Sequence, residues 1–124
     1  MDNKILEEIS LKITDIKLTV LQIAGNADGT GILLNIAPGY NYVGGKREDT
    51  QSHIRLEIVF PENAFEKVWV KVPGTKPIVT EEQLAQQSGK LRVKCKNLTG
   101  KFYRATNSGE YLLTCSADGA EVIQ

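Results

Sequence analysis

The strongest pattern in the sequence is an alternation of apolar and polar residues with a period of two. This is the period of a β-strand, in which successive side chains point to opposite faces of a sheet. The pattern is clearest over residues 53–60, where Arg55 and Glu57 separate apolar residues, and it ends at Pro61. Turn residues divide this segment from similar ones. The sequence predicts strands over residues 31–36, 53–60, 67–72, 90–96, 101–105 and 111–115.

The N-terminal alternation changes phase. Apolar residues occupy odd positions from Ile9 to Ile13 and even positions from Ile16 to Val20. A strand that changes phase contains a bulge or a bend, and bent strands curl a sheet into a barrel. We therefore expect a long strand that is bent at Thr14–Asp15. Residues 3–9 are also a candidate for one helical turn.

One helix is expected, because Thr80 to Gln83 form a capping box and Gly89 can end the helix. Residues 38–52 are expected to form a long connection. The pattern predicts an all-β, mainly antiparallel fold with one short helix, in a single domain of residues 1–124. A small, partly open barrel of the oligonucleotide/oligosaccharide-binding (OB) type fits best, and an SH3-like barrel or a sandwich is the alternative.

Catalytic and metal chemistry find little support in the sequence. His53 is the only histidine, and Cys95 and Cys115 are too far apart in sequence for a zinc-like motif. We expect no enzyme activity, no metal and no cofactor. The first residues do not resemble a secretory signal, and no apolar run approaches the ~20 residues of a membrane span. A cytoplasmic protein that makes no membrane contact is expected.

Charge is strongly segregated along a chain whose formal net charge is zero. The segment 83–109 contains six basic residues and no acidic one, so it carries +6 and the rest of the chain −6. Lys90, Arg92, Lys94 and Lys96 are two residues apart, which places them on one strand face at intervals of ~6.6 Å. A basic strand face accompanied by aromatic rings is typical of single-stranded nucleic-acid binding.

These observations define a candidate nucleic-acid site. Its stacking rings would be Trp69 and Tyr103, and its basic residues would follow the phosphates. The full candidate set is Lys90, Arg92, Lys94, Lys96, Lys101, Tyr103, Arg104, Trp69, Lys71, Lys46 and Arg47.

A structural role for the same basic strand is the alternative. Its lysines can face Glu57, Glu62 or Glu66 on a neighbouring strand, or protect a sheet edge from aggregation. The chain would then be a protein-interaction module or a structural subunit of a phage or mobile element, and it could form a homo-oligomer.

The segment 54–72, followed by Pro77–Ile78, resembles small accessory proteins of Gram-positive conjugative transposons and related integrative elements. The shared features are an alternating strand that ends in proline, a connector with a lysine, a second alternating strand and a Pro-Ile step. Tyr111 and the later Ala117–Asp118–Gly119 also fit the family's C-terminal part. The resemblance implies a non-catalytic factor in conjugative DNA processing that contacts single-stranded DNA, a helicase or a relaxase-associated protein.

Overall fold

The computed structural model describes residues 12–105 and 107–123. The strands are β1 (Lys17–Leu18), β2 (Thr30–Val43), β3 (Lys46–Phe60), β4 (Glu66–Pro73), β5 (Arg92–Lys96), β6 (Thr99–Arg104), β7 (Tyr111–Ser116) and β8 (Gly119–Ile123). The helical segments are η1 (Ile13–Asp15), α2 (Val20–Ala24), η2 (Pro61–Asn63) and α3 (Glu81–Gln86). The expected helical turn at 3–9 and the first residues of the expected N-terminal strand, Ile9 to Leu11, lie outside the described residues.

One mixed, mostly antiparallel sheet contains all eight strands in the order β1-β6-β7-β4-β3-β2-β5-β8. Among the described strands, only β4 and β7 pair in parallel, through Val70–Cys115 and Lys71–Ser116. The expectation of a mainly antiparallel all-β fold is therefore confirmed. The strands predicted over 53–60, 67–72, 101–105 and 111–115 lie within one residue of β3, β4, β6 and β7 or inside them.

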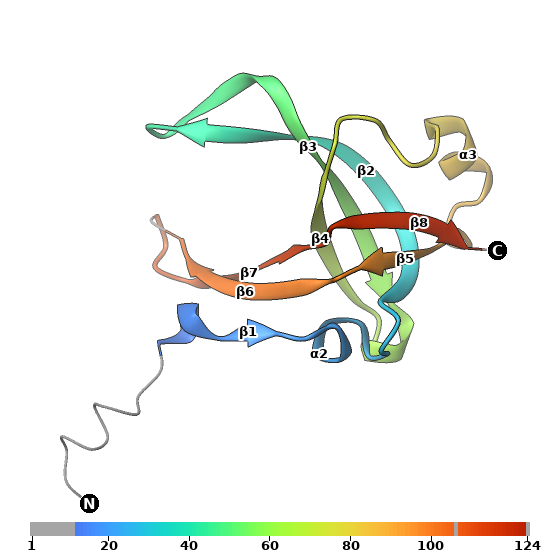
Figure 1. The fold of residues 1–124 in the computed structure, drawn as a ribbon, viewed down its shortest axis with the longest axis horizontal. Helices are drawn as coiled ribbons and strands as arrows, with labels where there is room; N and C mark the ends of the chain where they lie inside the picture. Colours follow the sequence, from blue (N-terminus) through green and yellow to red (C-terminus); the bar gives the residue numbers. More distant parts are fainter. Residues whose placement is uncertain (1–11, 106, 124) are drawn as a thin grey trace, which may run out of the picture.

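Strands β5 and β6 form one ribbon that bends at Asn97, a residue with a positive φ of 53°. Strands β7 and β8 follow the same bend, where Asn97 Nδ2 donates a 2.7 Å hydrogen bond to Asp118 Oδ2. This bent hairpin pairs with β4 through β7 and with β2 through β5. The pairings thus lead from β2 through β3, β4 and the bent hairpin back to β2, as in a partly open five-stranded barrel of OB type (Figure 1).

The barrel interior holds the hydrophobic core. Inward side chains of β3 and β4 alternate with outward polar ones, as the period of two predicts. Helix α2 covers one end of the core with Ile23 and Ala24, and Asn63 Nδ2 donates a 2.8 Å hydrogen bond to Ile23 O there. The largest fully buried side chains are Phe60, Leu33, Leu56, Ile58, Leu98, Val70 and Val93.

The prediction for the N-terminal region is wrong over residues 12–20. The structure has a 3-10 turn, the two-residue strand β1 and the start of α2 where one long bent strand was expected. The apolar residues change phase in this region because the chain passes from the 3-10 turn to β1 and then to α2. Thr19 and Gln22 form a capping box, with Gln22 N donating to Thr19 Oγ1 and Thr19 N donating to Gln22 Oε1, so a second short helix begins here.

Two other boundaries also differ from the expectation. Residues 38–52 are mostly strand, because β2 and β3 continue as a hairpin to a two-residue turn at Gly44–Gly45. Both glycines have positive φ, 59° and 80°, as a tight hairpin turn requires. Helix α3 begins after its expected cap Thr80 but ends at Gln86, before Gly89. Over the described residues, neither α-helix is long and apolar enough to cross a membrane.

Candidate nucleic-acid interface

The outer face of β3 and β4 forms the floor of a groove. Strand register places Arg55 opposite Lys71 and Glu57 opposite Trp69 on this face. Alternation in both strands turns these side chains outward while their neighbours enter the core. Glu57 itself is not among the residues that line the groove, and its Oε1 accepts a 2.7 Å hydrogen bond from Asn35 Nδ2 on β2.

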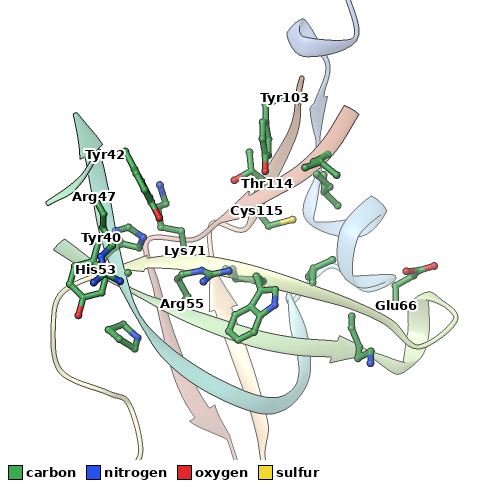
Figure 2. A pocket seen from close by; sticks show the side chains of 18 residues that line it. Tyr40, Tyr42, Arg47, His53, Arg55, Glu66, Lys71, Tyr103, Thr114 and Cys115 are labelled. Atoms are coloured by element: carbon green, nitrogen blue, oxygen red, sulfur yellow. The ribbon is translucent and has the colours of Figure 1, made fainter. Parts of the chain in front are cut away.

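Two hairpins form the walls of the groove. The β2–β3 hairpin and the β6–β7 hairpin extend to the same side of the barrel (Figure 1). The first contributes Tyr40, Tyr42 and Arg47, and the second contributes Tyr103 and Leu112. Figure 2 shows Tyr42 and Tyr103 on opposite sides, with Arg55 and Lys71 between them.

The groove has a volume of about 940 Å³ and is rich in positive charge. Four basic side chains line it, and Glu66 is the one acidic side chain among the described lining residues. Exposed aromatic rings accompany them, with Trp69 37% and Tyr103 46% exposed. The basic side chains are Arg47, Arg55, Lys67 and Lys71.

Two arginines in the groove lie over aromatic rings. The Arg55 guanidinium carbon is 4.6 Å from the centroid of the Trp69 ring, and that of Arg47 is 4.5 Å from the Tyr40 ring. Both distances are within the range of a cation–π interaction. These contacts hold the guanidinium groups in place beside flat apolar surfaces, which suits a ligand with both phosphates and bases.

His53 lies at the inner end of the groove floor and is only 8% exposed. Its ring packs against Gly39, where any Cβ would overlap the imidazole. Ser52 Oγ and His53 Nδ1 share a 2.6 Å hydrogen bond. Burial, together with the positive charges of Lys71 and Arg55, lowers the pKa of His53 below its ordinary value. The imidazole is therefore neutral over a wider pH range than a free histidine.

The structure brings together only some of the candidate residues. Arg47, Trp69, Lys71 and Tyr103 line the groove, whereas Lys101 lies in an adjoining hollow with Lys71. Lys46 and Arg104 lie on the two hairpins, but they are not among the groove-lining residues.

The basic face of β5 is exposed, as expected, but lies away from the groove. Lys94 and Lys96 line a separate hollow beside Glu121, and Arg92 lines another that contains Glu62. Lys94 is the direct cross-strand partner of Glu121. Lys90, exposed in the turn before β5, does not line the groove either. The bend at Asn97 separates the β5 residues from the β6 residues, so the candidate cations do not form one continuous track.

The candidate set predicted from the sequence did not include several groove residues, chiefly Arg55, Lys67, Tyr40 and Tyr42. The signal for the two tyrosines was the Gly44–Gly45 pair, which marks a two-residue hairpin and extends both flanking strands. Arg55 and Lys67 were on the predicted polar faces of their strands. Only the pairing of β3 with β4 shows that these faces join.

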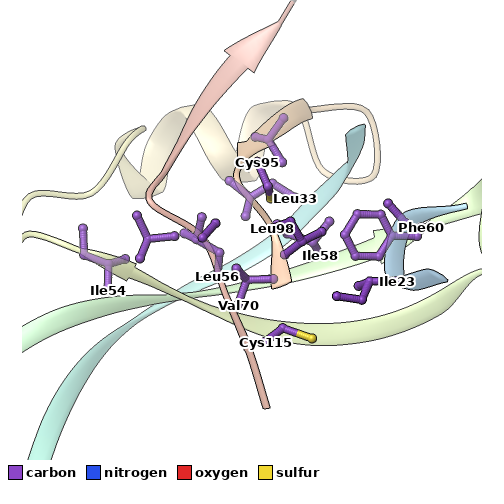
Figure 3. Packing of buried hydrophobic residues seen from close by; sticks show 14 of the residues in the cluster. Ile23, Leu33, Ile54, Leu56, Ile58, Phe60, Val70, Cys95, Leu98 and Cys115 are labelled. Carbon is purple, nitrogen blue, oxygen red and sulfur yellow. The ribbon is translucent and has the colours of Figure 1, made fainter. Parts of the chain in front are cut away.

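Cys95 lies apart from the groove, whereas Cys115, although buried, is among the residues that line it. Figure 3 shows Cys95 and Cys115 among the core side chains, and both are buried and free. Burial raises the pKa of each thiol to about 11, so both are protonated at neutral pH. Within residues 12–105 and 107–123, no three His, Cys, Asp or Glu side chains are grouped so that they could hold a metal ion.

Comparison of the chain with protein-family models, with curated proteins and with solved structures gave no match in any of the three.

Proposed function

We propose that this protein binds single-stranded DNA in the groove over β3 and β4 and that it acts without catalysing a reaction. The observation that carries the proposal is the groove itself, in which four basic side chains and one acidic side chain lie among exposed aromatic rings. Single strands are typically held by such a combination, since cations follow the phosphates and rings stack on the bases.

The position of the groove on the fold supports the proposal. Barrels of OB type bind oligonucleotides on the face of their second and third strands and with the loops that join strands one to two and four to five. In the circuit described above, β3 and β4 are the second and third strands. The β2–β3 turn and the β6–β7 turn are the two loops.

The cross-strand pairing of Arg55 with Lys71 also points to an anionic ligand. Like charges that lie directly opposite each other on neighbouring strands are destabilising. A phosphate between them would relieve this repulsion. The same argument does not apply to Lys94 on β5, because its cross-strand partner is Glu121.

Binding of a labelled oligothymidylate, measured by fluorescence anisotropy, tests the proposal. We expect affinity to fall steeply as salt increases, because bound cations release the counterions of the phosphates. Lys71→Gln should weaken binding much more than Lys94→Gln, a matched loss of one charge away from the groove. No binding by the wild-type protein at about 50 mM salt would contradict the proposal. A larger effect of Lys94→Gln would instead place the site on β5.

The association with a helicase or relaxase-associated protein of a conjugative element stays a prediction from the sequence resemblance. It is compatible with single-strand binding, because unwinding exposes single strands. A pull-down with such a helicase, in the presence and absence of an oligonucleotide, would test it separately.

A further inference from the structure

The groove leads into a second, smaller hollow on the outer face of β4, β7, β6 and β1. This hollow has a volume of about 410 Å³. Lys71 and Thr114 line both the groove and the hollow, so the two surfaces are continuous.

Strand register arranges the side chains of the hollow in two rows. The first row consists of Lys17 on β1, Lys101 on β6 and Thr114 on β7, which are successive cross-strand partners. The second row consists of Thr99, Ser116 and Lys71. Cross-strand partners lie on the same face, and rows two residues apart are separated by ~6.6 Å. Three lysines and three hydroxyl groups therefore converge on one small surface.

The charges of the hollow are unbalanced. Its lining residues include Lys17, Lys71 and Lys101, and no carboxylate is among those that the structure describes. Lys17 and Lys101 are direct cross-strand partners, an arrangement that repels unless an anion lies between the two ammonium groups. Ammonium and hydroxyl groups are suitable donors for the oxygens of a phosphate.

We infer that this hollow is a phosphate-binding subsite. The sugar-phosphate backbone of a bound DNA single strand would leave the groove through it. The inference rests on the proposed function and adds the path of the bound DNA to it. The DNA single strand crosses from the aromatic rings above β3 and β4 toward β6 and β1. Two sources of the phosphate share this chemistry, an internal phosphodiester and a terminal phosphate group.

Lys101→Gln is the decisive substitution, because Lys101 is exposed and lines the hollow but not the groove. For the full-length variant we expect a shallower slope when the logarithm of the association constant for the oligonucleotide is plotted against the logarithm of the salt concentration. The change should be about 0.7, the value for one phosphate contact on single-stranded DNA. Lys96→Gln, on β5, is the matched control and should leave the slope unchanged. Circular dichroism should show the same fold for both variants.

Oligothymidylates of about 4 to 16 nucleotides, with a 5′-phosphate, a 3′-phosphate or neither, distinguish the two sources. An internal phosphodiester predicts that the Lys101→Gln effect appears only above a minimum length, whatever the ends. A terminal phosphate predicts that the effect appears only with one phosphorylated end.

Different results would contradict the subsite and the proposed function. If Trp69→Ala weakens binding but Lys101→Gln behaves like Lys96→Gln, the subsite is wrong and the groove stands. If no oligonucleotide binds to the wild type, the proposed function is wrong. The hollow is then tested by adding inorganic pyrophosphate and measuring the changes in the NMR chemical shifts of the lysine side chains. Shifts at Lys17, Lys71 and Lys101 that disappear in Lys101→Gln would support an anion site, and their absence would overturn it.

Discussion

The Arg55 guanidinium lies over the ring of Trp69, with its central carbon 4.6 Å from the ring centroid. The two residues come from adjacent strands, and the contact leaves Trp69 37% exposed in the groove. A base that enters the groove can therefore stack on a ring whose position is already set, beside a cation that can contact its phosphate.

Trp69 is the only tryptophan of the chain, so intrinsic fluorescence reports on the groove directly. We expect saturable quenching when an oligothymidylate is added to the wild-type protein. Trp69→Ala should weaken binding, measured by anisotropy, by about 1–3 kcal/mol, the contribution of one stacked base. Trp69→Phe, which keeps a ring, should lose less. Equal losses in both variants would show that the ring does not stack on a base.

Gly39 and His53 are expected to be energetically coupled. Gly39→Ala forces a methyl group into the imidazole ring and should lower the free energy of unfolding by about 1–3 kcal/mol. Replacing His53 with alanine removes the obstacle. The double variant Gly39→Ala/His53→Ala should therefore be more stable than the sum of the two single effects predicts, by about 0.5–3 kcal/mol. Urea unfolding of the four proteins measures this difference, and additive effects would contradict the packing.

His53 should make stability depend on pH near neutrality. Its pKa is lowered in the folded protein, first by burial and then by Lys71 and Arg55, so the unfolded chain binds a proton more readily. The contribution of neutral His53 to the free energy of unfolding is fully present above the pKa of histidine in the unfolded chain, about 6.5. It is lost as the pH falls through the lower pKa of His53 in the folded protein. Urea unfolding between about pH 7.5 and 5.5 should show stability decreasing toward acid, by at most ~1.4 kcal/mol per pH unit.

His53→Gln provides the control for this pH dependence, because the chain contains no other histidine. The variant should show a flatter profile over the same pH interval. A profile as steep as that of the wild type would assign the effect to another group.

The thiols of Cys95 and Cys115 should react slowly in the native protein. With a pKa of about 11, roughly one thiol in a thousand is ionised at pH 8, and both side chains are buried. Ellman's reagent should therefore label both cysteines at once in urea but only at the rate of unfolding in native buffer. Rapid labelling of one thiol without urea would show that the barrel opens locally near that residue.

The sequence predicted the parts of the fold that depend on local alternation. Residues 53–60 and 67–72 show the period of two clearly, and they are the two strands of the groove floor. The N-terminal region was misread, because a phase change looks the same for a bulged strand as for a turn followed by a short helix. The capping box of Thr19 and Gln22 was the available signal.

The groove was only partly predictable, since it depends on which strand faces come together. Trp69 and Lys71 could be identified as exposed residues, but their proximity to Arg55 follows from long-range pairing. The charge count over 83–109 treated β5 and β6 as one surface. The positive φ of Asn97, which turns the ribbon between them, is not evident from charge or alternation.

The bent hairpin of β5 to β8 takes part in both the barrel and the groove, since β5 pairs with β2 while β6 and β7 provide one wall of the groove. The wall cannot persist once the barrel has come apart. An oligonucleotide that recognises only the intact groove should accordingly raise the melting temperature in proportion to the logarithm of its concentration above saturation. Thermal denaturation thus offers a screen for ligands of this chain that requires neither a label nor a variant.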